Sequence, residues 1–203
     1  RSASAVARSR GPATPGSLVV GPLINETVAE GGAVRRGCGT RGPPLPASRA
    51  ATARLARMCG RFTQQRPSAE LAALFAADDL AATPGGRFNL APQQSGLVVV
   101  ERPDERRAIV AYRWGLVPTW AKDPRIGNRL INARAETVAT TPAFRSAFRK
   151  RRCLVPADAF YEWERVAESI RQPNLIRRSD GELMAFAGLW SPWRDPAEPE
   201  GEW

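Results

Sequence analysis

Hydrophobic and polar positions follow a regular period only from Cys59 onward. Residues 96–100 read GLVVV and residues 108–114 read AIVAYRW, and the polar, proline-containing run ERPDERR separates them. Two β-rich runs joined by such a loop predict an antiparallel hairpin. Further β-rich runs predict strands at 153–163, 173–178 and 183–190.

Two helices are predicted. Leu71, Leu74 and Phe75 recur at i, i+3 and i+4 behind Ser68, so a helix capped by Ser68 is expected to end before the Pro84-Gly85-Gly86 turn and to bury these three side chains. A second, short helix is expected after Thr141 as cap, with Pro142 at its first position and Phe144 and Phe148 on its buried side.

Short helices among many strands favour an α+β domain with mostly antiparallel β-sheets and short flanking helices. The final run, WSPWRDPAEPEGEW, resembles a loop with no closing element. We therefore expect one domain over residues 58–203 that is incomplete at its C-terminus.

The first 57 residues differ in composition from the rest. They contain nine Arg and two Glu, a net charge of +7 out of +10 for the chain, and no Lys, Trp, Tyr or Phe. Such a segment buries too little apolar surface to offset its ordering entropy, so residues 1–57 are expected to be a disordered or spurious basic extension. Two explanations stay open: a tail that binds nucleic acid, or upstream GC-rich DNA translated in frame.

Composition also bears on where in the cell the protein is located and on whether it binds a cofactor. The longest apolar stretch near the start, SLVVGPLI, is too short to span a membrane, and no signal-peptide cleavage pattern follows a charged start. A cytoplasmic bacterial protein, associated with the nucleoid when bound to DNA, is expected. Cys38, Cys59 and Cys153 lack metal-ligand spacing and the chain has no His, so neither a metal nor an organic cofactor is implied.

Met58 precedes Cys59 and suggests an internal start. Translation from Met58 and removal of that Met would leave Cys59 as the amino terminus, with an α-amine of pKa about 7.7–8.0 beside a thiol of pKa about 8.5. Such an aminothiol attacks an aldehyde twice, through an imine and then a thiazolidine ring. The alternative is that Cys59 is a small buried apolar residue.

Five blocks follow in order: CGRF from Cys59, RFNLAPQQ at 87–94, WGLVPTWAK at 114–122, INARAET at 131–137 and CLVPADAFYEW at 153–163. In these blocks the sequence resembles the SOS-response-associated peptidase (SRAP) family, from Met58 to about Trp190. The resemblance implies covalent capture of the aldehyde of abasic sites in single-stranded DNA, as a thiazolidine DNA–protein cross-link, with lyase activity as a related outcome.

The family's catalytic residues match three positions. Cys59 would be the nucleophile, Asn132 would orient the sugar oxygens or the amine, and Glu162 would move protons while the ring opens. Read without the family, Asn132 would close a turn and Glu162 would face solvent on a strand.

The resemblance also implies DNA contacts. Arg61 and Arg134 would bind phosphates, and Trp120 would stack on an unpaired base, whereas Trp114 is expected in the core. Asn89 and Pro92 match a block near the floor of the site, with either a contact or a structural role. Basic residues near the blocks would form a local groove: Arg61, Arg87, Arg113, Lys122, Arg129 and Arg134.

Two departures from the family pattern matter. The family's active-site His has no counterpart, because the chain contains no His. With residues 1–57 attached, the nitrogen of Cys59 is an amide and cannot form a thiazolidine. The first interpretation is therefore a monomeric abasic-site cross-linking enzyme; the alternatives are a non-catalytic binder of single-stranded nucleic acid and a cysteine peptidase that removes its own leader.

Overall fold

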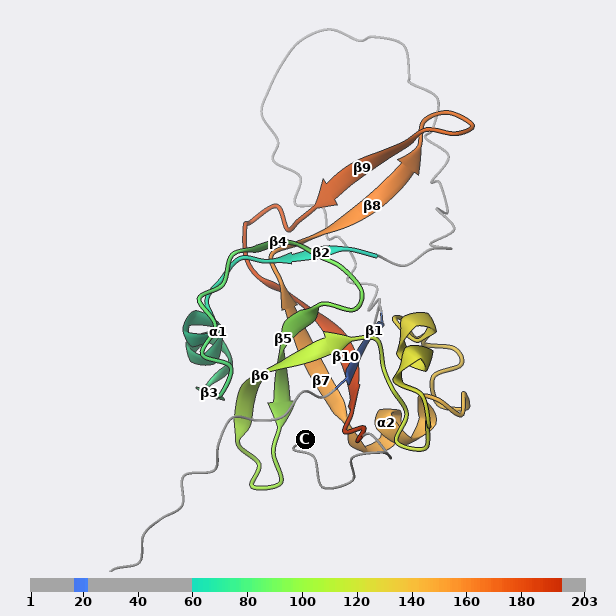
Figure 1. Ribbon diagram of the computed structural model, residues 1–203. Helices are drawn as coiled ribbons and strands as arrows, with labels where there is room; N and C mark the ends of the chain where they lie inside the picture. Colours follow the sequence, from blue (N-terminus) through green and yellow to red (C-terminus); the bar gives the residue numbers. More distant parts are fainter. Residues whose placement is uncertain (1–16, 22–59, 195–203) are drawn as a thin grey trace, which may run out of the picture. The chain divides into compact units, whose positions relative to one another are not determined.

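A computed structural model of the chain describes the backbone of residues 17–21 and the backbone and side chains of residues 60–194. Two β-sheets carry most of this part, and short helices flank them (Figure 1). Antiparallel pairings predominate. The prediction of an α+β fold with mostly antiparallel sheets is therefore confirmed.

Sheet A has six strands: β1 (Ser17–Gly21), β3 (Ala77–Asp79), β5 (Ser95–Glu101), β6 (Arg107–Trp114), β7 (Arg152–Ala157) and β10 (Met184–Ser191). Their order is β1-β10-β7-β5-β6-β3, and β1 also pairs in parallel with β6. Strands β1, β10, β7, β5 and β6 thus form a closed ring, with β3 outside it. Closure leaves no free edge within the ring.

Strand β1 lies inside the segment whose composition predicted no ordered structure. Its backbone pairs with β10 over five positions, from Ser17 opposite Ser191 to Gly21 opposite Ala187. Backbone pairing of this kind depends on two open strand edges elsewhere in the fold, which the composition of a segment does not reveal. The other residues of 1–57, and residues 195–203, lie outside the described part of the chain.

Sheet B has four strands: β2 (Phe62–Gln64), β4 (Arg87–Leu90), β8 (Ala159–Arg165) and β9 (Arg171–Ile176). Their order is β4-β2-β8-β9, and every pair is antiparallel. Strands β8 and β9 continue past the other two as a two-stranded ribbon (Figure 1). Sequence analysis predicted β9 as a run at 173–178 and included most of β8 in a single run at 153–163, but it missed the short strands β2, β3 and β4.

The core lies where the two sheets meet. Phe62 and Leu90 of sheet B pack with Val98, Val110 and Trp114 of sheet A, and all five are buried. The rings of Phe62 and Trp114 have centroids 5.2 Å apart. Trp114 is 1% exposed, which confirms its predicted place in the core.

Helix α1 (Ser68–Phe75) covers the opposite face of sheet A. Strand β5, which contains the GLVVV run, therefore packs apolar side chains on both of its faces. Leu71 packs against Leu97, Val99 and Ile109. Leu74 does not: it is 56% exposed, so its predicted burial is wrong. The helix is only eight residues long, and the face that packs on sheet A is too narrow to include Leu74 as well as Leu71.

Ser68 does not cap the helix as predicted. It is the first helical residue, and its Oγ donates to Asp79 at 2.8 Å and accepts from the backbone N–H of Thr83 at 2.7 Å. The hydroxyl therefore ties the helix to β3 and the following turn. The second helix, α2 (Arg145–Lys150), begins three residues later than the predicted start at Pro142. Phe144, not Thr141, occupies the position before its first residue.

The predicted strand at 153–163 is two strands in different sheets. The break falls at Asp158, whose carboxylate accepts from Gln65 N at 2.6 Å and from Arg66 Nε at 3.1 Å. These bonds hold the corner between β7 and β8 against the end of β2. A β-rich run in the sequence does not show such a corner.

Gln64 joins the two sheets through its side chain. It is 3% exposed, and its Nε2 donates to Leu97 O at 2.7 Å and to Pro156 O at 2.8 Å. Its Oε1 accepts from Leu97 N at 2.8 Å. One buried amide thus satisfies three backbone groups of β5 and β7 and fixes β2 against sheet A.

Replacing Gln64 by Leu is expected to destabilise the protein by about 3 kcal/mol, because it leaves three buried backbone groups without partners. Urea unfolding of the full chain measures the effect. Gln65→Leu is the matched control, because the side chain at position 65 is exposed and its substitution should shift stability by about 0.5 kcal/mol at most. Equal losses in the two variants would contradict the role of Gln64.

Candidate functional site

Arg61 is fixed between two strands of sheet B. Its Nη1 donates to Asn89 Oδ1 at 2.9 Å, and its carbonyl accepts from Tyr161 N at 3.0 Å. Arg61 and Asn89, both predicted DNA contacts, therefore touch each other. Cys59, the predicted nucleophile, lies two residues before Arg61 and outside the described part of the chain.

Glu162 lies on β8, next to the residue that binds the Arg61 carbonyl. It is half-buried and stands opposite Asn174 of β9. The Asn174 amide donates instead to Glu164, at 3.3 Å, so this bond engages the next carboxylate on the same side of the strand. On the other side of β8, the Tyr161 hydroxyl donates to Phe88 O at 3.1 Å and joins the strand to β4.

Trp114 anchors the segment that carries Asn132. Its indole N–H donates to Ile131 O at 2.6 Å, and the backbone of Leu116 donates to Leu130 O at 3.0 Å. The same Trp114 accepts through its carbonyl from Gln93 N at 2.8 Å, in the turn after Pro92. The Pro92 turn and the Asn132 segment are thus held by one buried residue at the end of β6.

Trp120 is 61% exposed, on the loop that follows β6. A close crossing of backbones shapes the start of this loop: Gly115 has φ +134°, and a Cβ there would lie 2.6 Å from Gly127 O in the 3₁₀ helix Pro124–Arg129. At the other end, Trp193 Nε1 donates to Ala121 O at 2.7 Å. Sequence analysis missed Trp193 and the two glycines, since no local motif marks them.

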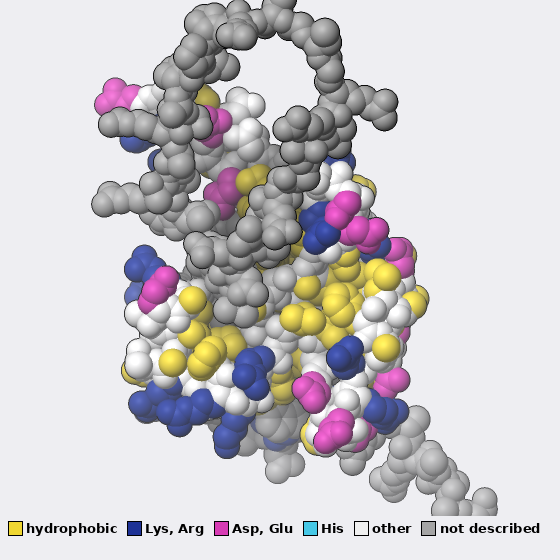
Figure 2. Space-filling model, turned by 180° about the vertical axis from the view of Figure 1, so that it is seen from behind, with side chains coloured by type: hydrophobic (Ala, Val, Ile, Leu, Met, Phe, Trp, Pro, Cys, Tyr) yellow, Lys and Arg dark blue, Asp and Glu magenta, His cyan; other side chains and the backbone are white. Residues whose placement is uncertain are grey.

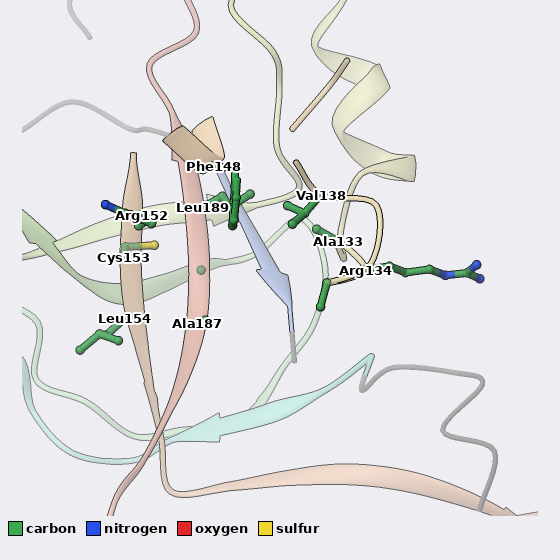
Figure 3. Close-up of a pocket in the computed structure, with 11 residues that line it drawn as sticks. Ala133, Arg134, Val138, Phe148, Arg152, Cys153, Leu154, Ala187 and Leu189 are labelled. Atoms are coloured by element: carbon green, nitrogen blue, oxygen red, sulfur yellow. The ribbon is translucent and has the colours of Figure 1, made fainter. Parts of the chain in front are cut away.

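Arg134 is exposed, and its side chain points away from a cavity of about 250 Å³ that its own segment lines (Figure 3). The cavity wall includes Val138, Phe148, Cys153 and Leu189 and is almost entirely apolar. A rear view of the molecule also shows hydrophobic side chains gathered on its surface (Figure 2). Apolar walls offer no partners to phosphates, so this cavity is a poor DNA site.

The basic residues predicted to form a groove are not neutralised by neighbouring carboxylates. Ion pairs in the described residues involve other arginines: Arg66, Arg102, Arg106, Arg125 and Arg178. Arg113 instead donates to the side chains of Gln93 and Asn128. An anionic ligand would therefore meet unpaired positive charge near the blocks.

Two buried titratable groups lie inside sheet A. Burial raises the pKa of the Cys153 thiol, and burial together with Cys153 raises the pKa of Tyr112 to about 12. Both groups therefore stay neutral at physiological pH. Neither is poised for nucleophilic chemistry, because the reactive form of a cysteine is its thiolate.

The sequence matches one protein family and several named proteins. A scan of protein families matches residues 58–203 to SRAP, described as SOS response associated peptidase. The chain is 40% identical over 143 residues to the abasic site processing protein YoqW of Bacillus subtilis, covering 68% of this chain and 62% of that protein. It is 36% identical over 150 residues to the abasic site processing protein YedK of Escherichia coli, covering 71% and 65%.

Solved structures support the fold. A protein from Bacteroides thetaiotaomicron superposes with a TM-score of 0.61 at 21% identity, covering 71% of this chain and 64% of that one. A protein from Bordetella bronchiseptica gives 0.57 at 27% identity, covering 68% and 66%. No helix among the described residues is long and apolar enough to cross a membrane.

Cys153 should resist alkylation in the folded protein. At pH 8 its raised pKa and its burial keep it a protected thiol, so iodoacetamide should modify it only after unfolding in guanidinium. Peptide mass spectrometry measures the labelling. Rapid labelling of Cys153 in the native chain would contradict this burial.

The raised pKa of Cys153 also makes the stability of the fold depend on pH. As the pH rises, the thiol ionises at a lower pH in the unfolded chain than in the folded chain. The stability that this group contributes is therefore present below about pH 8.5 and is lost as the pH rises above it.

Proposed function

The chain belongs to the SOS response associated peptidase (SRAP) family, and on that premise we propose that it captures abasic sites in single-stranded DNA through Cys59 as an amino-terminal residue. The relatives named above are called abasic site processing proteins, which supports an abasic site as the substrate. This chain spans about three fifths of the length of YoqW.

The chemistry proposed for Cys59 needs a free α-amine. The amine attacks C1′ of the ring-opened sugar aldehyde, and loss of one water gives an imine. The Cys59 sulfur then adds to the imine carbon, the new C–S bond closes a five-membered ring, and the proton of the thiol passes to the nitrogen as the C=N double bond becomes a single bond. One water is released in total, and no oxidant or reductant takes part.

The observation that carries this proposal is the backbone bond from Tyr161 N–H to Arg61 C=O, 3.0 Å long. It pairs the residue two positions after Cys59 with the residue that precedes Glu162. A half-buried carboxyl group within reach of an amine can take a proton from it and return that proton to the leaving water. Glu162 is the proposed proton carrier.

The remaining predicted residues would hold the DNA. Arg61, oriented by Asn89, and Arg134, directed to solvent, can each bind a phosphate oxygen. The Asn132 amide can orient the sugar, and Trp114 fixes the backbone beside it. Trp120, exposed on a loop held at both ends, can stack on a neighbouring base.

A comparison of two forms of the protein with different amino-terminal residues tests the proposed capture. The chain beginning at Arg1 and a form beginning at Cys59 are incubated with single-stranded DNA that carries one abasic site, and denaturing gels show any covalent adduct. An adduct is expected only where Cys59 has a free amine, including any Arg1 chain that loses its leader.

Cys59→Ala in the form that begins at residue 59 is the control, because it keeps the free amine and removes the thiol. An imine can still form in this variant, but it hydrolyses, so the stable adduct should disappear. No adduct from the folded Cys59 form would contradict the proposal and favour a non-catalytic binder.

Glu162→Gln should slow capture about 100-fold, because an amide cannot carry the proton. Glu164→Gln is the matched control: it lies on the same side of β8, and Asn174 already binds it. Adduct formation over time, with DNA in excess, measures the rates. Equal effects of the two substitutions would contradict a specific role for Glu162.

A further inference from the structure

We propose that one face of the β8–β9 ribbon binds the sugar–phosphate backbone of single-stranded DNA beyond the capture site, through Arg165 and Arg171. This inference concerns the path of the DNA and rests on the proposed function for the identity of the ligand. The ribbon is closed at its tip by Val166 N–H and Ala167 N–H, which both donate to Ile170 O. It extends past β2 and β4 of sheet B, whereas α2 lies at the other end of the described part (Figure 1).

The register of the ribbon separates its side chains into two faces. Successive residues of a strand point to opposite faces, and cross-strand partners share a face. One face therefore carries three partner pairs: Tyr161 with Leu175, Trp163 with Pro173, and Arg165 with Arg171. The other face carries Phe160 with Ile176, Glu162 with Asn174, and Glu164 with Gln172.

The two faces differ in charge. Both strand carboxylates, Glu162 and Glu164, lie on the second face, so the first face is basic at the tip and aromatic towards the base. The rings of Tyr161 and Trp163 lie 6.3 Å apart, and Trp163 is 39% exposed. Aromatic side chains followed by arginines suit a strand with bases that stack and phosphates that carry charge.

Arg165 and Arg171 are an unusual pair for a free surface. They are direct cross-strand partners and both are exposed. Neither forms an ion pair with any carboxylate in the described residues. Like charges directly opposite each other destabilise an antiparallel pair. A phosphate bound between the two guanidinium groups would remove that repulsion.

Strand β8 connects the arginine pair with the proposed capture site. The Tyr161 backbone binds Arg61, and four residues of β8 lead from Tyr161 to Arg165, a span of about 13 Å. DNA that contacts Arg61 could therefore continue along the aromatic side chains to the tip. Charge complementarity favours DNA over a peptide, because the paired strand positions of this face carry two arginines and no acidic side chain, and Glu168 in the tip loop is the one carboxylate between the two arginines in sequence.

Salt-dependent binding tests the proposal. The Arg165→Gln/Arg171→Gln double variant of the full chain is compared with the unsubstituted chain, by fluorescence anisotropy with undamaged single-stranded DNA between about 50 and 200 mM salt. Loss of two phosphate contacts should reduce the slope of log K against log salt by about 1.4. This corresponds to binding about 25-fold weaker at 0.1 M salt.

The matched control is Arg145→Gln/Arg149→Gln on α2, which removes the same charge from exposed positions far from the ribbon. Its slope should stay within about 0.3 of the unsubstituted value, because it removes no phosphate contact. Melting temperatures check folding; the ribbon variant should melt no lower than the parent, because it relieves a repulsion. Equal slopes in the ribbon variant and the parent, or equal reductions in both variants, would overturn the proposal.

Undamaged DNA cannot be captured, so this test is separate from the proposed function. A chain that captures abasic sites but shows an unchanged slope in the ribbon variant would retain the function and lose this inference. A chain that fails to capture but shows the reduced slope would retain the ribbon as a binding surface and lose the covalent chemistry.

Discussion

The Gln64 side chain is the constraint on which the site depends. Its amide binds the backbones of β5 and β7, so the short strand β2 cannot move relative to sheet A. Asp158 secures the next residues, through Gln65 N and the Arg66 side chain. Because β2 is fixed, Arg61, the residue just before it, is held between Asn89 of β4 and Tyr161 of β8.

Different kinds of interaction support different parts of the proposed DNA path. Buried aromatic packing and the Trp114 indole hold the Asn132 segment, while a backbone crossing at Gly115 and the Trp193 indole hold the loop of Trp120. Arginines such as Arg61 and Arg134 form no ion pair among the described residues. The division is physically reasonable, because precise orientation needs buried partners, whereas phosphate attraction tolerates exposed and mobile side chains.

Sequence reasoning predicted the hairpin at 96–114, because two long apolar runs flank one polar loop, and it predicted the burial of Trp114. It missed β2, which has three residues and includes a buried Gln64 that reads as polar and exposed. It also missed the corner at Asp158 and the link from Trp193 to Ala121, since both depend on residues more than 70 positions apart. The paired arginines of the ribbon became visible only with the strand register.

The most direct test of the account is the state of the Cys59 sulfur in the adduct. The form that begins at Cys59 is reacted with abasic single-stranded DNA, treated with iodoacetamide after unfolding, digested and analysed by mass spectrometry. A thiazolidine predicts a sugar-linked Cys59 peptide, lighter by one water than its two parts, that carries no alkyl group. An adduct whose Cys59 sulfur is alkylated, or one attached at another residue, would contradict the aminothiol mechanism.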